Sequence, residues 1–280
     1  MYNKSMFDSI KDALSKSEKT GGNPLYKEIL KFKPGNTYVL RLLPNIADPS
    51  NTFFHFYQHG WNSFSTGEYV SALSLQTFGK PDPIGMETYR IKKTGSPEQK
   101  SKVEAVKWQE QWYVNVYVVD DPVTPENNGT VKIFRFGRKL HKIIDSAING
   151  DDSDEFGSRV FDLSKEGVNF KLKAEKQGEY TTYDSSRFTS PINLNLSEER
   201  IKEIYGSLHD LTAVNQAKSE EELIQMWNKH FLCKDQESVF EKSFEPQTNK
   251  SSFTESSELN SSVEELSDDM VNELIKGYDQ

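Results

Sequence analysis

The stretch "WYVNVYVVDDPVTPENNGTVKIFRFGRKLHKII", residues 112–144, decides the fold. Residues 112–119 are almost all β-branched or aromatic, a composition that favours a β-strand. Residues 120–129 combine Asp, Pro, Asn and Gly, which is typical of turns. Because residues 130–136 alternate between two faces, as a second strand would, the pattern predicts a β-hairpin.

The hairpin is followed by a predicted helix that begins with cations. The apolar residues after Gly137 recur at helical spacing: Leu140, Ile143, Ile144 and Ala147. Arg138 and Lys139 stand in the first turn, where positive charge opposes the helix dipole. We therefore expect this helix either to expose a solvated face or to receive an anion at its start.

The composition of the 280 residues allows one sizeable core with appendages. A mean hydropathy of −0.72 indicates that part of the chain does not pack. The N-terminus lacks the apolar core of a signal peptide, and no run approaches the roughly 18 apolar residues of a membrane span. The single cysteine, Cys233, excludes an intrachain disulfide and a zinc-binding thiolate cluster. These features predict a protein of a reducing compartment with no membrane partner.

The net charge of −9 lies in the last segment of the chain. Residues 235–280 carry 12 acids and 3 lysines, whereas residues 1–234 carry 31 acids and 31 bases. This segment is rich in Ser, Glu and Asn and cannot bury enough apolar surface to fold alone. Near its end, an apolar stripe with acids beside it is typical of a docking peptide. The residues expected to bind partners are Leu266, Met270 and Leu274 of this stripe and the acids Asp268 and Asp269 beside it.

These patterns divide the chain into three parts. We expect an N-terminal arm over residues 1–21, a folded core over residues 22–234 and a disordered acidic tail over residues 235–280. Within the core, residues 58–111 are rich in Gly and Pro and predict an irregular subdomain. Residues 196–233 change to helical periodicity, and the sequence Ser-Glu-Glu-Glu at 219–222 predicts a capping box at the start of the last helix.

The sequence contains no catalytic motif, which predicts that the protein is not an enzyme. It has no phosphate-binding Gly-Lys-Ser/Thr loop and no serine elbow. The five histidines do not have the spacing of metal ligands, and the acidic loop 151–157 lacks the Gly and the distal Glu of a calcium loop. A nuclease, the enzymatic alternative, would need a carboxylate cluster that holds metal.

Aromatic and basic residues instead lie close together along the predicted strands. A groove for single-stranded nucleic acid needs both kinds, because cations follow the phosphates and rings stack on bases at about 1–3 kcal/mol each. The rings are Trp108, Trp112, Tyr113, Tyr117, Phe134, Tyr180 and Tyr183, and the cations include Lys107, Arg138, Lys139 and Lys173. Core packing is the alternative for each ring. Since Trp112 and Tyr113 are adjacent, we expect one of them to face away from the core.

Several blocks of the chain resemble the gene 32 protein family, the single-stranded DNA-binding, helix-destabilising proteins of T-even-type bacteriophages. The longest block is "VNVYVVDDPVTPENNGTVKIFRFGRKLHKI" at 114–143. Shorter blocks are "VLRLLP" at 39–44, "QHGW" at 58–61 and "GVNFKLK" at 167–173. The likeness covers about residues 38–190.

The resemblance implies an oligonucleotide-binding (OB-fold) β-barrel core, mainly β with helical appendages, joined to a self-association arm and an acidic partner tail. It implies cooperative coating of single-stranded DNA during phage replication, recombination and repair, in the cytoplasm of an infected bacterial host. The implied partners are DNA, further copies of the chain, and phage replication and recombination proteins. Carried over by position, the groove residues are Arg41, Tyr113, Phe134, Arg138, Lys139 and Tyr180, with Trp112 and Tyr183 beside them.

Two features depart from the family pattern. The best-known members hold zinc with one His and three Cys, but here His59 stands alone and residues 60–110 contain no Cys. We therefore expect no zinc and no other cofactor, and a subdomain that is ordered by packing. The residues expected at the centre of this packing are Trp61, Phe64, Tyr69 and Phe78. The basic self-association arm is reduced to Lys4 and Ser5.

An RNA-binding regulator with the same barrel is the alternative function, because base stacking does not distinguish the 2′-hydroxyl of RNA. The acidic tail leads to a further hypothesis, in which residues 255–280 occupy the basic groove until DNA displaces them. Truncation after Lys234 is then expected to tighten DNA binding at low salt, where electrostatic screening is weak.

Overall fold

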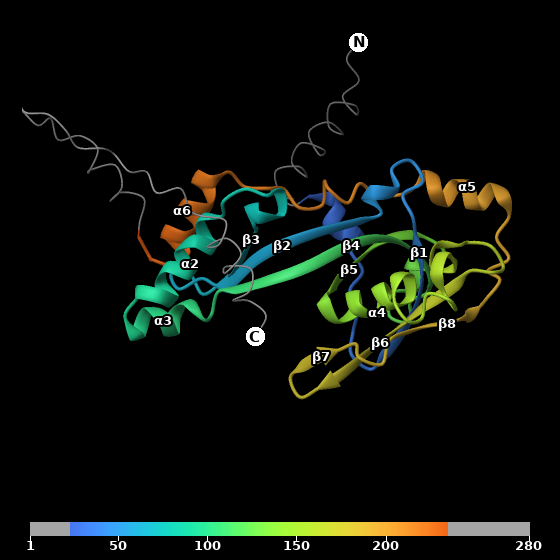
Figure 1. Ribbon diagram of the computed structural model, residues 1–280, viewed down its shortest axis with the longest axis horizontal. Coiled ribbons are helices and arrows are strands. Elements are labelled where there is room, and N and C mark those ends of the chain that lie inside the picture. Colours follow the sequence, from blue (N-terminus) through green and yellow to red (C-terminus); the bar gives the residue numbers. More distant parts are fainter. Residues whose placement is uncertain (1–22, 235–280) are drawn as a thin grey trace, which may run out of the picture. The chain divides into compact units, whose positions relative to one another are not determined.

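A computed structural model of the protein describes residues 23–234 (Figure 1). The predicted arm, residues 1–21, and the predicted tail, residues 235–280, lie outside the described residues. The roles expected for Lys4, for Ser5 and for the apolar stripe of the tail therefore stay predictions.

Within residues 23–234, eight strands form an antiparallel sheet. They are β1 (Asn36–Leu43), β2 (Phe53–Asn62), β3 (Tyr69–Leu73), β4 (Lys107–Asp120), β5 (Val131–Gly137), β6 (Val168–Gln177), β7 (Tyr180–Thr182) and β8 (Arg187–Pro191). The order is β3-β2-β4-β1-β6-β7, with β5 on β4 and β8 on β6. The first half of β4 pairs with β2 and the second half with β1, while β5 runs along its other edge.

The sheet curls into a half-barrel; α4 packs on the sheet, and the other helices lie toward its two ends (Figure 1). The helices are α2 (Pro83–Thr94), α3 (Pro97–Val103), α4 (Arg138–Asn149), α5 (Glu198–Gly206) and α6 (Glu220–His230). The short 3-10 helices are η1 (Pro24–Glu28), η2 (Pro49–Asn51), η3 (Leu75–Phe78), η4 (Pro125–Asn127) and η5 (Gly157–Phe161). This architecture confirms a mainly β protein with α appendages and is compatible with an OB-like core.

The predicted hairpin and the helix after it are confirmed as β4, β5 and α4. The register places Trp112 opposite Phe136. In the turn, the buried carboxylate of Asp121 accepts two backbone N–H groups and the side-chain amide of Asn127. Asp121 therefore has a structural role, because it satisfies the polar backbone of a tight turn.

The main core lies between the curled sheet and α4. Residues from both sides of this layer are almost fully buried: Leu40, Val114, Phe134, Leu140, Ile144 and Phe170. The apolar residues whose spacing predicted α4 therefore form the face of the helix that packs against the sheet.

The opposite face of β4 is covered as well. Tyr113 and Ile133 pack there against Leu211 and Val214, which lie between α5 and α6. Trp112 is in the main core, so both members of the Trp112–Tyr113 pair are buried. The expectation that one of them faces away from the core is wrong, because β4 has packed residues on both of its faces.

Residues 58–111 are regular, so the prediction of an irregular subdomain is wrong. They form the end of β2, then β3, η3, α2, α3 and the start of β4. Pro83 and Pro97 stand at the starts of α2 and α3, and Gly95 follows the end of α2. The Pro and Gly content that indicated irregularity marks helix boundaries, where these residues are favoured.

The helix α6 completes the core of this helical subdomain, which we define as residues 58–106 with α6 (Figure 1). The capping box predicted at its start is present between Ser219 and Glu222. Three rings meet in this core. The ring centres of Trp61 and Trp227 are 6.0 Å apart, and Trp227 stacks on Phe231 with their ring centres 3.9 Å apart.

The prediction of which aromatic residues form the core of the subdomain is only partly right. Trp61 is buried, but Phe64, Tyr69 and Phe78 are 40%, 61% and 48% exposed. The error has a simple cause, because α6, far away in the sequence, supplies the rings that fill this core.

No helix within residues 23–234 combines the length and apolar character needed to cross a lipid bilayer.

Candidate nucleic-acid interface

One face of β2 and β4 carries a row of stacked rings. Strand alternation and register place His55 and Tyr57 of β2 on the same face as Trp108 and Trp112 of β4. Tyr57 stacks on Trp108 at 4.7 Å, and His55 stacks on Trp112 at 4.7 Å. The row continues to α4, where His141 lies 4.1 Å from Trp112. We call these five residues the aromatic strip.

The two ends of the aromatic strip differ in exposure. Trp112 is only 8% exposed because His55 and His141 both stack on it. Tyr57 and Trp108 are half-buried, so each keeps part of its surface in solvent. An incoming base can therefore stack on the end formed by Tyr57 and Trp108.

Arg138, the first residue of α4, lies over this exposed end. Its guanidinium carbon is 5.7 Å from the centre of the Trp108 ring, a cation–π distance. Its Nε donates to Glu110, and the other carboxylate oxygen of Glu110 lies 2.8 Å from Nε2 of His55. Burial and then the charge of Glu110 raise the pKa of the Tyr57 hydroxyl.

Arg138 also lines a pocket of about 340 Å³ at the junction of β5 and α4. The lining residues are Phe32, Gln111, Phe134, Arg135, Phe136, Gly137, Arg138, Lys139, Leu140 and Tyr183. We call this the ring-and-cation pocket. Its volume is at the lower end of the range of about 300–1,000 Å³ for small-molecule sites. Because Gly137 precedes α4 without a side-chain cap, the first N–H groups of the helix favour an anion here.

Further cations lie at the pocket and beyond it. Lys139 Nζ is 3.1 Å from Asp184, and Lys173 Nζ is 2.8 Å from Glu175. These ion pairs are exposed and therefore weak, so a phosphate can displace the carboxylates. Lys107 is exposed next to Trp108 at the start of β4.

The two tyrosines predicted from the β6–β8 region differ in position. Tyr183 is half-buried and lines the ring-and-cation pocket, and burial raises the pKa of its hydroxyl. Tyr180 is 80% exposed at the β6–β7 turn. Tyr183 therefore shares the lining of this pocket with Lys139.

The structure corrects the expectation that Arg41 lines the groove. Arg41 is fully buried, and its guanidinium donates to Asn169 Oδ1 at 2.8 Å and to the carbonyls of Asp162 and Ile192 at 2.6 and 2.9 Å. Burial lowers the pKa of Arg41 to about 10, although the charge of Asp162 opposes this shift. Each of its three nitrogens donates to β6 or to a neighbouring segment, and the side chain is fully buried, so Arg41 has a structural role.

Tyr113 and Phe134, also expected in the groove, have no exposed surface. Tyr113 packs between Phe54, Phe56 and Leu211, and burial raises the pKa of its hydroxyl. Phe134 belongs to the main core, although it also lines the ring-and-cation pocket. In this conformation neither ring can stack on a base.

Four residues of the interface were missed from the sequence. Phe32 lies 5.6 Å from Phe134 and lines the pocket, and its position between Lys31 and Lys33 was the available signal. His55, Tyr57 and His141 belong to the aromatic strip. For His55 and Tyr57 the signal was their spacing in "FFHFY", because residues two positions apart on a strand lie on the same face.

The family's zinc site does not fit the residues at its expected place. His59 is buried, and its Nε2 lies 3.1 Å from Oδ1 of the equally buried Asp82. Within residues 23–234, no three His, Cys, Asp or Glu side chains are grouped to hold a metal ion. The expected absence of zinc stays a prediction.

These features define a mainly antiparallel β protein that presents stacked rings beside cations, the class to which the oligonucleotide-binding folds belong. The family model described as "gp32 DNA binding protein like" matches residues 34–232, and the chain belongs to this family. It is similar to the single-stranded DNA-binding proteins of Enterobacteria phages T4 and T2, each 30% identical over 192 residues. The matches cover 66% of this chain and 62% of each phage protein, which is less than two thirds of the relatives' length.

Proposed function

We propose that the chain binds single-stranded DNA without sequence preference and catalyses no reaction. The observation that carries the proposal is the position of Arg138. It stands over Trp108 at the exposed end of the aromatic strip and also lines the ring-and-cation pocket. One cation thus joins a stacking surface to an anion-binding helix start, the two elements that a single strand requires.

The chemistry of the two parts suggests how a strand would lie. Bases stack on Trp108 and Tyr57, while the phosphates between them contact Lys107 and Arg138. The next nucleotide places its base against Phe32 and Tyr183 in the pocket and its phosphate at the start of α4. Ring faces accept every base, so the contacts carry little sequence information. Family membership and the names of the T4 and T2 relatives support this function.

The wider role follows from the family resemblance. We infer cooperative coating of single strands with self-association through the N-terminal arm, and recruitment of phage replication, recombination and repair proteins through the acidic tail. The setting is the cytoplasm of an infected bacterium, and no cofactor is required. The segments concerned lie outside the described residues, so the support comes from the sequence.

A fluorescence titration tests the DNA-binding proposal. The full chain is titrated with poly(dT), poly(rU) and duplex DNA at two salt concentrations, and its tryptophan emission is followed. We expect quenching and tightest binding with poly(dT), with a log–log salt slope of about −0.7 for each phosphate contacted. Affinity that does not depend on salt, or equal affinity for duplex DNA, would refute the proposal. Tighter binding of poly(rU) would indicate an RNA-binding protein instead.

A further inference from the structure

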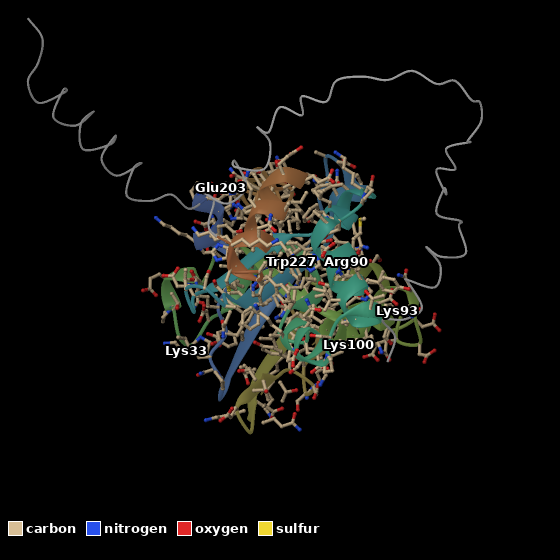
Figure 2. All side chains as sticks on the ribbon, turned by 90° about the vertical axis from the view of Figure 1, so that its left-hand side faces the viewer. Lys33, Arg90, Lys93, Lys100, Glu203 and Trp227 are labelled. Atoms are coloured by element: carbon tan, nitrogen blue, oxygen red, sulfur yellow. The ribbon has the colours of Figure 1, made fainter. Side chains whose placement is uncertain are left out.

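The α2–α3 corner of the helical subdomain carries exposed cations outside the interface described above. Lys93 is in the last turn of α2 and Lys100 is in α3, and the capping box of Ser96 lies between them. Arg90, one turn before Lys93, is exposed as well. Figure 2, which looks onto this end of the sheet, shows Arg90, Lys93 and Lys100 on the same face. We call these three residues the helical basic edge.

The packing of the subdomain does not require these charges. Its core is the ring cluster around Trp61. Lys102, by contrast, is committed to the packing: it donates to the Phe231 carbonyl and lies 4.4 Å from the Phe64 ring. Lys93 lies 5.4 Å from the exposed ring of Tyr89, which leaves its ammonium at the surface.

The guanidinium of Arg90 also keeps donors for a ligand. Its Nε and Nη2 groups bind the carboxylate of Glu87 at 2.7–3.1 Å. An exposed pair of this kind, three residues apart on a helix, is weak. Five N–H donors are present on a guanidinium, so a phosphate can bind Arg90 without breaking this pair.

The helical basic edge is connected directly to the exposed end of the aromatic strip. α3 ends at Val103, and β4 begins at Lys107, immediately before Trp108. Since a chain spans at most about 3.3–3.6 Å per residue, the Cα atoms of Lys100 and Trp108 are no more than about 29 Å apart. Sites on OB folds extend over about 4–16 nucleotides, so a strand that stacks on Trp108 can be long enough to reach α3.

We propose that a single strand leaving the aromatic strip at Trp108 continues along the helical basic edge, where Lys100, Lys93 and Arg90 contact its phosphates. The edge supplies charge but little ring surface, so it binds the sugar–phosphate backbone and does not read bases. It lengthens the binding site and increases the salt dependence of binding. The proposal rests on the proposed function, because it extends the same strand.

The test compares oligothymidylates of about 4 and about 16 nucleotides, the ends of the range for OB folds. The variant carries Arg90→Gln, Lys93→Gln and Lys100→Gln. The matched control carries Lys165→Gln, Lys202→Gln and Lys218→Gln, three lysines that are exposed elsewhere. Each lost phosphate contact is expected to reduce the magnitude of the log–log salt slope by about 0.7. On the longer oligonucleotide we therefore expect the slope of the variant, which loses three contacts, to be smaller in magnitude by about 2 than that of the wild type. The control is expected to keep the wild-type slope.

The short oligonucleotide distinguishes direct contact with the helical basic edge from a general effect of the lost positive charge. We expect it to occupy only the aromatic strip and the pocket, so the variant should bind it as the wild type does. An unchanged slope on the longer oligonucleotide overturns the proposal, as does an equal loss in the control or an equal loss on both lengths. If the wild type binds neither length, the proposed function fails and the extension fails with it.

Discussion

His59 and Asp82 form a buried pair, with Nε2 of His59 3.1 Å from Oδ1 of Asp82 and both residues 2% exposed. Burial alone raises the pKa of Asp82. The hydrogen bond and charge of His59, the hydroxyl of Ser74 and the N–H of Gly85 outweigh burial and lower the pKa to about 2. The same carboxylate accepts the N–H of Leu75 at 2.9 Å, so it connects β2, η3 and the start of α2.

This pair predicts an acid-sensitive contribution to stability. The folded pKa of Asp82 lies below its ordinary value of 3.8, so the ionised form stabilises the fold above about pH 4. The contribution, about 2 kcal/mol, is lost as the pH falls toward 2. Urea unfolding of the wild type and of Asp82→Asn between pH 7 and about 2.5 measures it. We expect the asparagine variant to be less stable at pH 7 and to lose less on acidification. Parallel pH curves for the two proteins would contradict this assignment.

Metal removal is predicted to have no effect on stability. His59 is bound to Asp82, and the only cysteine, Cys233, is exposed beyond the end of α6. A structural zinc site would contribute directly to folding, so its removal would lower the melting temperature. We expect the same thermal transition with and without a chelator. Stoichiometric zinc in elemental analysis of the purified protein would show that ligands outside this arrangement hold a metal.

Arg41→Met is predicted to destabilise the core without a direct effect on DNA. The change leaves Asn169 and the carbonyls of Asp162 and Ile192 without their buried donor. Each unsatisfied polar group costs about 1–3 kcal/mol, so we expect a loss of at least about 3 kcal/mol in the free energy of unfolding. Chemical denaturation measures the loss, and DNA titration is done where the variant is folded. A variant that is stable but binds DNA more weakly would indicate that Arg41 contacts DNA.

Local features of the fold could be predicted because their signals are local. The β4–β5 hairpin follows from turn residues between two β-like runs, and α4 follows from its apolar spacing. The capping box at Ser219 is a four-residue pattern and is present as predicted. Cations beside rings in the sequence pointed to Trp108 and Arg138, which the structure brings together.

The remaining features depend on contacts between distant segments. Trp61 is covered by α6, more than 150 residues later, and nothing in the sequence near either one indicates this pairing. Tyr113 is buried because Leu211 and Val214 cover its face of β4. Strand alternation tells which residues share a face, but a face that is covered by a distant loop has the same pattern as an exposed one. For this reason the sequence could not show that Tyr113 is fully buried whereas Trp108 is partly exposed.

Tyr113→Ala and Phe134→Ala are predicted to act on stability. Both side chains are fully buried, and truncation of a large core ring costs about 3–5 kcal/mol. Thermal or urea unfolding should show this loss in both variants, whereas Tyr180→Ala, at an exposed ring, should unfold like the wild type. Normal stability together with weak DNA binding in either core variant would mean that the ring reaches the ligand after all.

Trp108 and Trp112 provide the sharpest comparison, since they lie on the same face of one strand and differ in exposure. Trp108→Ala removes a half-exposed ring next to Arg138, so we expect DNA affinity to fall by about 1–3 kcal/mol with little change in unfolding. Trp112→Ala removes a buried ring between His55 and His141, so we expect a stability loss of about 3–5 kcal/mol.

Fluorescence adds an independent measurement to this comparison. The chain has four tryptophans, and Trp61, Trp112 and Trp227 are buried. Quenching by DNA should therefore come mainly from Trp108 and should largely disappear in Trp108→Phe, a change that keeps a ring for stacking and hence most of the affinity. Full quenching in Trp108→Phe would place the bound bases against a different tryptophan and would move the interface away from this end of the aromatic strip.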